Sequence, residues 1–187
     1  MTCYRRRLPH WHPEGVTFFV TWRLYGTLPA TKVELKEDEK AGAAFAAWDR
    51  ELDQHGAGPV WMKRPGVARC VTQVLRDAES EWGLCDLRAW VVMPNHVHVL
   101  LLPRKRLIRV LQAIKSASAR RANQVLGRTG QPFWQEESFD RWVRGREEEE
   151  RIARYIDRNP VRAGLARAVG EWPWCSAAVA EHGSAPR

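Results

Sequence analysis

One stretch near the middle of the chain restricts the possible folds more than any other. It reads VVMPNHVHVLLL over residues 91–102, two apolar runs joined through Pro94-Asn95. Pro-Asn between apolar runs is typical of a tight turn, and the second run is typical of a buried strand. Because successive side chains of a strand point to opposite faces, His96 and His98 share one face, and Val97 and Val99 share the other. The stretch predicts a hairpin that presents two imidazoles side by side.

This histidine pair has two interpretations. Neutral imidazole is a common metal ligand, and alternate positions on a strand hold both rings near one point. Two partly buried histidines that are satisfied by hydrogen bonds would produce the same short pattern. The pair alone does not separate a metal site from a structural one.

The surrounding sequence predicts a small α+β domain. Strands are expected over 16–24, 86–93 and 96–102, helices over 34–52, 67–81 and 107–126, and a short strand or packed segment over 132–143. This order is that of a split βαβ unit, a ferredoxin-like or RRM-like antiparallel sheet with helices on one face. A length of 187 residues fits one domain. We place it at residues 1–180, with a helical insertion at about 30–65 and a short flexible tail at 181–187.

A last helix is predicted over Glu147–Arg158. Pro160 disfavours the helical conformation at the preceding residue, so the helix is expected to end at Asn159. Tyr155 and Asn159 lie one turn apart on the same face. They fit a packed tyrosine with an asparagine cap. They also fit a phenol nucleophile beside an amide that completes a metal site begun by the histidines.

The charge distribution indicates a polyanionic partner. The formal net charge is +8, and residues 87–135 contain nine Lys and Arg residues and no acid. A basic excess confined to one segment favours nucleic-acid binding, although any single arginine in it would be ordinary on a protein surface. His10 and His12 fit a solvated basic arm better than metal ligands.

Other classes of protein are excluded by composition. No apolar run approaches the length that spans a membrane, and no apolar segment of a signal peptide follows Arg5-Arg6-Arg7, so we expect a cytoplasmic protein. The four cysteines have no Cys-x-x-Cys spacing, which favours reduced thiols over disulfides or a zinc cluster.

Three motifs taken together resemble a known family. They are MPNHVHVL at 93–100, FWQ at 133–135 and YIDRNPVRAGL at 155–165. In this order they are similar to the REP-associated tyrosine transposases, which are single-tyrosine HUH (His-hydrophobic-His) transposases of the insertion-sequence type. The resemblance extends from Tyr4 to Ser176. It departs from many relatives at Phe139-Asp140-Arg141, where they carry Tyr-Asp-His.

The resemblance implies a role for each motif. His96 and His98 would be metal ligands with Asn159 as the third, and Tyr155 would be the nucleophile. Such enzymes cleave and rejoin single-stranded, hairpin-bearing DNA through a 5′-phosphotyrosine link, with Mg²⁺ or Mn²⁺ as the divalent metal, or Ni²⁺ or Zn²⁺ as purified. The residues expected to hold DNA phosphates are Arg5, Arg6, Arg7, Arg104, Lys105, Arg106, Arg109, Lys115, Arg120 and Arg121.

The main hypothesis is therefore a transposase of the bacterial cytoplasm, nucleoid-associated when bound to DNA. It would need no membrane and no nucleotide cofactor, and a monomer is favoured over a homodimer. A non-catalytic protein that binds DNA or RNA hairpins through the same sheet is the alternative. A structural zinc domain would need further Cys or His ligands beside the pair. Binding alone requires none of His96, His98, Tyr155 and Asn159, so their joint presence favours the enzyme.

Overall fold

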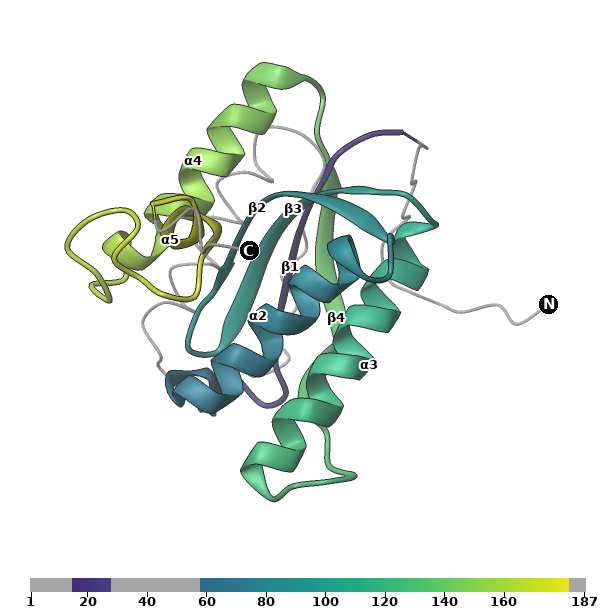
Figure 1. Ribbon diagram of the computed structural model, residues 1–187, viewed down its shortest axis with the longest axis vertical. Coiled ribbons are helices and arrows are strands. Elements are labelled where there is room, and N and C mark those ends of the chain that lie inside the picture. The colour runs from purple at the N-terminus through teal and green to yellow at the C-terminus, as the bar shows by residue number, and fades with distance from the viewer. Residues whose placement is uncertain (1–14, 28–57, 182–187) are drawn as a thin grey trace.

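Four antiparallel strands form one sheet at the centre of the computed structural model (Figure 1). The structure describes residues 15–27 and 58–181. The strands are β1 (Phe18–Leu24), β2 (Cys85–Val92), β3 (His96–Pro103) and β4 (Trp134–Trp142), in the spatial order β2-β3-β1-β4. This is the predicted ferredoxin-like order, and the first three strands begin and end within two residues of their predicted bounds.

Two helices cover one face of the sheet. A 3₁₀ turn, η1 (Trp61–Lys63), leads into α2 (Pro65–Ser80), and α3 (Leu107–Leu126) lies beside α2 across the front of the sheet in Figure 1. Alternate residues of β1 and β3, among them Trp22, Val97 and Val99, are buried against the apolar sides of these helices. The strand alternation predicted around the histidines is confirmed.

The opposite face carries a second, smaller core. Phe19, Val91 and Leu100 of the sheet pack there with Ile152 and Ile156 of α4 (Arg146–Arg162). The prediction that helices lie on one face therefore describes α2 and α3, whereas α4 packs on the histidine face. An amphipathic helix needs an apolar surface to cover, and this face of β1, β2 and β3 supplies one.

Helix α4 continues beyond the predicted end at Asn159, so that boundary was wrong. Pro160 lies inside the helix, which ends at Arg162. A regular C-terminal cap stabilises the extra turn: Gly164 has φ +69°, its amide donates to Val161, and the amide of Leu165 donates to the carbonyl of Pro160. The hydrogen bond lost at the proline is thus followed by a helix end whose Pro160 and Val161 carbonyls both have a donor.

The C-terminal part of the described chain covers one edge of the sheet. Backbone amides of Trp90 and Val92 on β2 donate to the hydroxyl of Ser176, at the start of α5 (Ser176–Glu181), and to the carbonyl of Trp174. The indole of Trp172 donates to the carbonyl of Val92. β2 is the outer strand next to β3, so these bonds occupy groups that an uncovered edge would expose.

Several predictions fall outside the described residues or on their border. The helix over 34–52, most of the proposed insertion, the Arg5-Arg6-Arg7 arm and nearly all of the tail lie outside them. No helix among the described residues is long and apolar enough to cross a membrane. Cys70, Cys85 and Cys175 are free thiols, and burial raises the pKa of Cys85 to about 12, with the carboxylates of Glu79 and Asp86 adding to the effect.

Candidate active site

The two histidines of β3 face each other at the centre of the second core. Their Nε2 atoms are 3.0 Å apart, and both side chains are fully buried. Each occupies the face that strand alternation predicts, because Val97 between them points into the other core. The sequence motif therefore folds into a convergent imidazole pair.

A separate hydrogen bond holds the far nitrogen of each ring. Nδ1 of His96 is 2.7 Å from Oδ1 of Asn95, and Nδ1 of His98 is 2.7 Å from Oγ1 of Thr21. With the amide oxygen of Asn95 on this side, Nδ1 of His96 is the donor in this bond and its Nε2 is the nitrogen that faces His98. Outer partners of this kind fix the ring orientation of metal-binding histidines.

Helix α4 brings the other two candidate residues to the histidines. Nδ2 of Asn159 lies 3.4 Å from Nε2 of His98, and its side chain is fully buried. The oxygen and nitrogen of an amide exchange places when the group flips, so an oxygen is equally able to face the imidazoles. The centre of the Tyr155 ring lies 5.9 Å from the centre of the His98 ring and 6.3 Å from the centre of the Phe19 ring. Tyr155 is partly exposed.

This donor set fits a divalent metal ion. Two neutral imidazole nitrogens and an amide oxygen are ordinary ligands of such ions, and three protein ligands leave coordination positions open. Among residues 15–27 and 58–181, no three His, Cys, Asp or Glu side chains lie where they could hold a metal ion. The amide of Asn159, 3.4 Å from His98, is the further candidate ligand, and its role stays a prediction.

Two arginines beside the site were not predicted from the sequence. The guanidinium of Arg162 lies 5.1 Å from the centre of the Tyr155 ring, an arrangement that exists because α4 continues past Pro160. Arg23 pairs with His96 in the β1–β3 register, and burial lowers its pKa, against the opposite effect of Glu137. Arg23 lies two residues from Thr21 and therefore on the same face of β1. This spacing points to the site only once the pairing of β1 with β3 is known.

The basic segment is less free than its sequence indicates. Asp86 on β2 binds Arg104, Asp77 on α2 binds Arg121 at 2.8 Å, and Lys115 donates to two carbonyls of β4. The absence of acids within the segment was therefore misleading, because neighbouring elements supply them. Within residues 15–27 and 58–181, the members that are exposed and make no such contact are Lys105, Arg106, Arg109 and Arg120.

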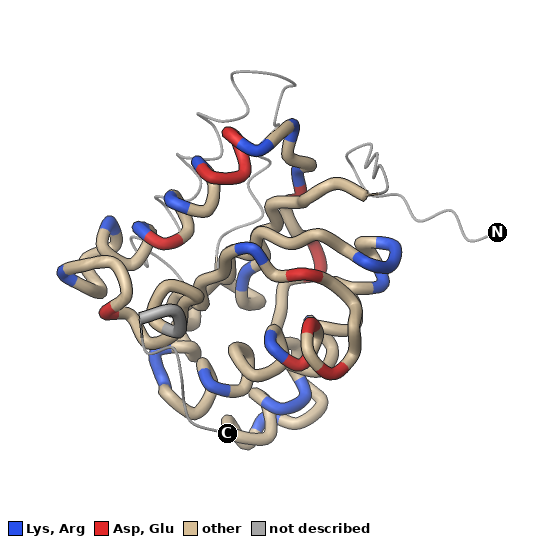
Figure 2. Tube along the Cα trace, turned by 45° about the horizontal axis from the view of Figure 1, so that its top comes forward, with Lys and Arg blue, Asp and Glu red and all other residues tan. Residues whose placement is uncertain are grey.

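The placement of α3 separates its basic residues from the histidines. Helix α3 packs on the face of the sheet opposite to His96 and His98, so the sheet lies between them. Figure 2 shows Lys and Arg at intervals over most of the described chain, mixed with acids along α4. Sequence periodicity gives the inner side of a helix but not the face of the sheet that it covers.

Comparison with known proteins identifies the family of this chain. The family model described as IS200-like transposase matches residues 61–159, just over half of the chain. The chain belongs to the IS200-like transposase family. The matched range begins at η1 and ends at Asn159, so it contains the histidine motif and Tyr155 of this IS200-like chain.

One solved structure shares this fold, and a second is reported for comparison only. A REP-associated tyrosine transposase bound to a REP hairpin is 19% identical, with a TM-score of 0.57, over 100% of this chain and 89% of that one. A transposase-like protein from Deinococcus radiodurans is 18% identical, with a TM-score of 0.39, over 83% of this chain and 98% of that one. The comparison with curated proteins gives no significant match.

Proposed function

We propose that this IS200-like transposase cleaves and rejoins single-stranded, hairpin-bearing DNA through a covalent bond between Tyr155 and a 5′-phosphate. The proposal rests on one observation. The side chains of His96, His98, Asn159 and Tyr155 lie close together between β3 and α4. Family membership supports transposition chemistry, and the REP hairpin bound to a structural relative supports the class of DNA.

His96 and His98 would hold a divalent ion through Nε2, and Asn159 through its amide oxygen. We propose Mg²⁺ or Mn²⁺ as the native ion. When bound, the ion polarises the phosphodiester and neutralises charge that develops on its oxygens. The protein contributes the fixed ring orientations from Thr21 and Asn95, so the ligands need little reorganisation.

The phenol oxygen of Tyr155 is the nucleophile. It attacks the scissile phosphorus, the phenol proton passes to solvent, and the bond from phosphorus to the 3′-oxygen breaks. The 3′-oxygen takes a proton from solvent and leaves as a free 3′-hydroxyl, and the 5′-phosphate stays on the tyrosine. Attack by a second 3′-hydroxyl reverses the exchange and rejoins DNA without a nucleotide cofactor, because the number of phosphodiester-type bonds is unchanged.

Arg162 and Arg23 are placed to bind the DNA phosphates that enter the site. Arg162 is exposed beside the Tyr155 ring, and Arg23 is half-buried beside His96. Tyr155 is the partly exposed member of a site whose His96, His98 and Asn159 side chains are fully buried, so the substrate approaches along the tyrosine. Farther contacts are proposed for Lys105, Arg106, Arg109 and Arg120.

The proposal is tested with full-length protein, Mn²⁺ and labelled single-stranded oligonucleotides that carry the hairpins flanking the gene. A denaturing gel then separates free DNA from DNA bound covalently to protein. We expect a covalent band with wild type, no band with Tyr155→Phe, and no band when EDTA replaces Mn²⁺. Tyr25→Phe is the matched control, because Tyr25 is exposed and lies outside the site.

Hairpin retardation without any covalent band, equal in wild type and Tyr155→Phe, would overturn the enzyme proposal and leave a hairpin-binding protein. Light scattering of the protein with and without DNA tests the proposed monomer. A stable homodimer would contradict it.

A further inference from the structure

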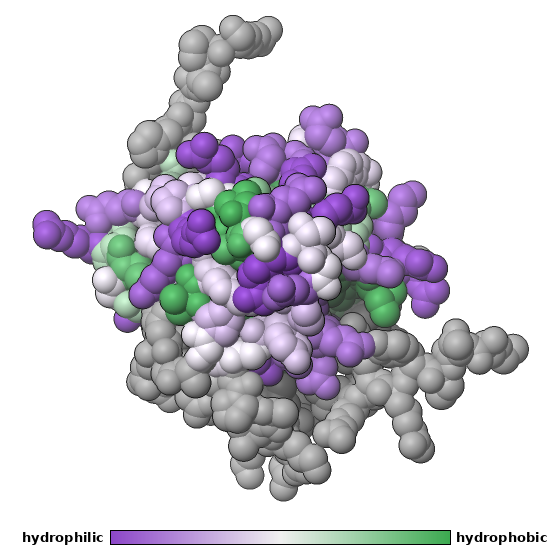
Figure 3. Space-filling view, turned by 90° about the horizontal axis from the view of Figure 1, so that it is seen from below, coloured by the Kyte–Doolittle hydropathy of each residue, from purple (hydrophilic) through white to green (hydrophobic). Residues whose placement is uncertain are grey.

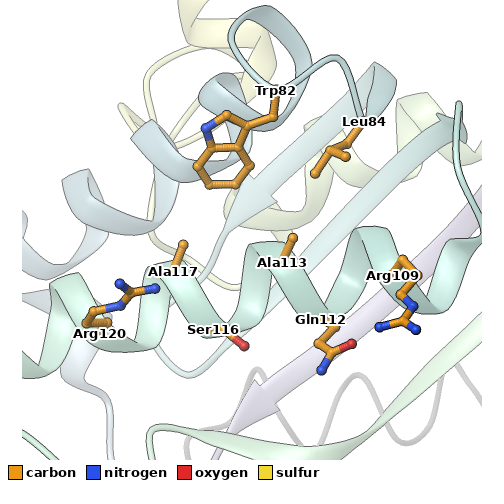
Figure 4. Close-up of a pocket in the computed structure, with 8 residues that line it drawn as sticks. All are labelled: Trp82, Leu84, Arg109, Gln112, Ala113, Ser116, Ala117 and Arg120. Carbon is orange, nitrogen blue, oxygen red and sulfur yellow. The ribbon is translucent and has the colours of Figure 1, made fainter.

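A shallow groove lies on the molecule between α3 and the turn that connects α2 to β2 (Figure 4). Its volume is about 560 Å³, within the range of small-molecule sites. The lining residues of α3 belong to its solvent side, and α3 covers the sheet face opposite to the histidines. The groove is therefore separate from the candidate active site.

A partly exposed aromatic ring forms the side of the groove that faces α3. Trp82 is 37% exposed, and its indole is directed at α3 over Ala117 (Figure 4). Ala113, one turn earlier on α3, also has a small side chain, so the floor of the groove is low there too. Leu84 adds an apolar wall. On the surface shown in Figure 3, hydrophobic side chains form small separate patches among hydrophilic ones, not one broad apolar surface. A low floor beside an exposed indole suits a flat ring better than a protein helix.

Both ends of the groove are positively charged. Arg109 and Arg120 stand roughly three helical turns apart, or ~16 Å along α3. Both are exposed, and among the described residues neither has an acidic partner, in contrast to Arg121, which binds Asp77. Among the described residues, no acidic side chain lines the groove. The two guanidinium groups are therefore suited to bind two anionic groups that belong to different repeating units of one extended polymer.

We infer that this groove binds single-stranded DNA, with an unpaired base stacked on Trp82 and backbone phosphates held by Arg109 and Arg120. The identity of the polymer rests on the proposed function. Stacking on aromatic rings with phosphate contacts on either side is the general mode of single-strand binding. A duplex would satisfy the guanidinium groups but would leave the indole unused, because its bases are stacked inside. The groove gives the transposase a second DNA contact across the sheet from Tyr155.

The test uses full-length protein in EDTA and a fluorescein-labelled 20-nucleotide dT strand, which forms no hairpin, with affinity measured by anisotropy. We expect Trp82→Leu to bind about tenfold more weakly, as for one lost stacking contact, and Trp82→Phe to restore most of the affinity. Arg109→Gln with Arg120→Gln should weaken binding and reduce the slope of log K against log salt by about 1.4. Arg69→Gln, an exposed arginine of α2 outside the groove, should change neither quantity by as much.

Unchanged dT affinity in Trp82→Leu and in the double arginine variant would overturn the inference. A second result would also overturn it. If the double arginine variant loses as much affinity for a 20-base-pair duplex as for dT, and Trp82→Leu has no effect on binding, the groove is a duplex site. A lowered melting temperature of Trp82→Leu with unchanged affinity would show that the groove is filled by the chain itself. If wild type fails to cleave hairpin DNA but the groove variants lose dT binding, the proposed chemistry fails and this inference stands.

Discussion

A single hydrogen bond, between Thr21 and His98, fixes the orientation of one imidazole of the candidate site. Thr21 lies on β1 directly opposite His98, and both side chains are fully buried. The bond of 2.7 Å occupies Nδ1 and directs Nε2 toward His96. A threonine in the first strand thus orients a histidine 77 positions later in the chain.

Thr21→Val is expected to lower divalent-metal affinity by about 10- to 100-fold, because valine keeps the shape of threonine but removes the oxygen that orients the ring. Titration calorimetry with Mn²⁺ and Ni²⁺ measures the change. Thr72→Val is the matched control: Thr72 is buried on α2, and its hydroxyl has no hydrogen-bond partner in the part of the chain that the structure describes. We expect that variant to keep wild-type metal affinity and stability. Equal affinities in the two variants would show that Thr21 has no part in positioning His98.

At the scale of elements, the end of α4 decides whether Arg162 reaches Tyr155. The last turn depends on Gly164, whose φ of +69° is strained for residues with a Cβ. A Cβ at this position would meet nothing within 4 Å, so the cost of a side chain is one of backbone conformation alone.

Gly164→Ala is expected to destabilise the fold by about 1–2 kcal/mol, the cost of a left-handed conformation for an L-residue. Urea denaturation measures the change in free energy of unfolding. Gly66→Ala, in the first turn of α2, should be neutral or slightly stabilising, because Gly66 has no positive φ and a Cβ there meets Val125 at an ordinary 3.4 Å. If both variants have wild-type stability, the cap does not hold the end of α4.

The pair of helices on the other face is joined by Asp77 and Arg121. Burial tends to raise the pKa of Asp77, but hydrogen bonds from Gln73 and Arg121 outweigh it and lower the pKa below its usual 3.8. A lowered pKa in the folded protein stabilises it above the unfolded value, and this contribution is lost as pH falls through the folded value.

Asp77→Asn should therefore be less stable than wild type at pH 7, by about 0.2–1 kcal/mol for a partly exposed pair, and the two proteins should converge in acid below the usual pKa. Urea denaturation at pH 7 and pH 2.5 measures both differences. A double-mutant cycle with Arg121→Gln isolates the pair. A difference that persists unchanged at pH 2.5 would assign the effect to something other than the carboxylate.

At the scale of the whole molecule, the C-terminal segment closes the β2 edge of the sheet. It supplies acceptors for the amides of Trp90 and Val92. Cys175 also forms an isolated antiparallel β-bridge with Val91. An edge left open by its removal would be a template for pairing with a second chain.

A chain that ends at Glu171 is expected to self-associate and to melt at a lower temperature than wild type. Light scattering after size exclusion and thermal unfolding measure the two effects. Trp172→Phe removes only the indole bond to Val92, so it should cost about 0.5–1.5 kcal/mol and leave the elution volume unchanged. Wild-type elution and melting of the shortened chain would show that the edge needs no cover.

The sequence alone predicts the hairpin at Pro94-Asn95 and the order of the described elements from β1 to α4, with 132–143 as either a strand or a packed segment. It also proposes the four candidate site residues, whose roles stay predictions. Each of these depends on short-range information: the two-residue period of strands put His96 and His98 on one face, and the 3.6-residue period of helices did the same for Tyr155 and Asn159. The family motifs then predicted their roles.

Only the tertiary structure decided which other residues accompany them. Thr21 reaches His98 through strand register, and Arg162 reaches Tyr155 because a glycine cap outweighs the local effect of Pro160. The acids that pair with Arg104 and Arg121 come from other elements, and α3 lies on the face away from the histidines. These contacts depend on which surfaces bury together in space, and neither periodicity nor local propensity along the chain contains that information.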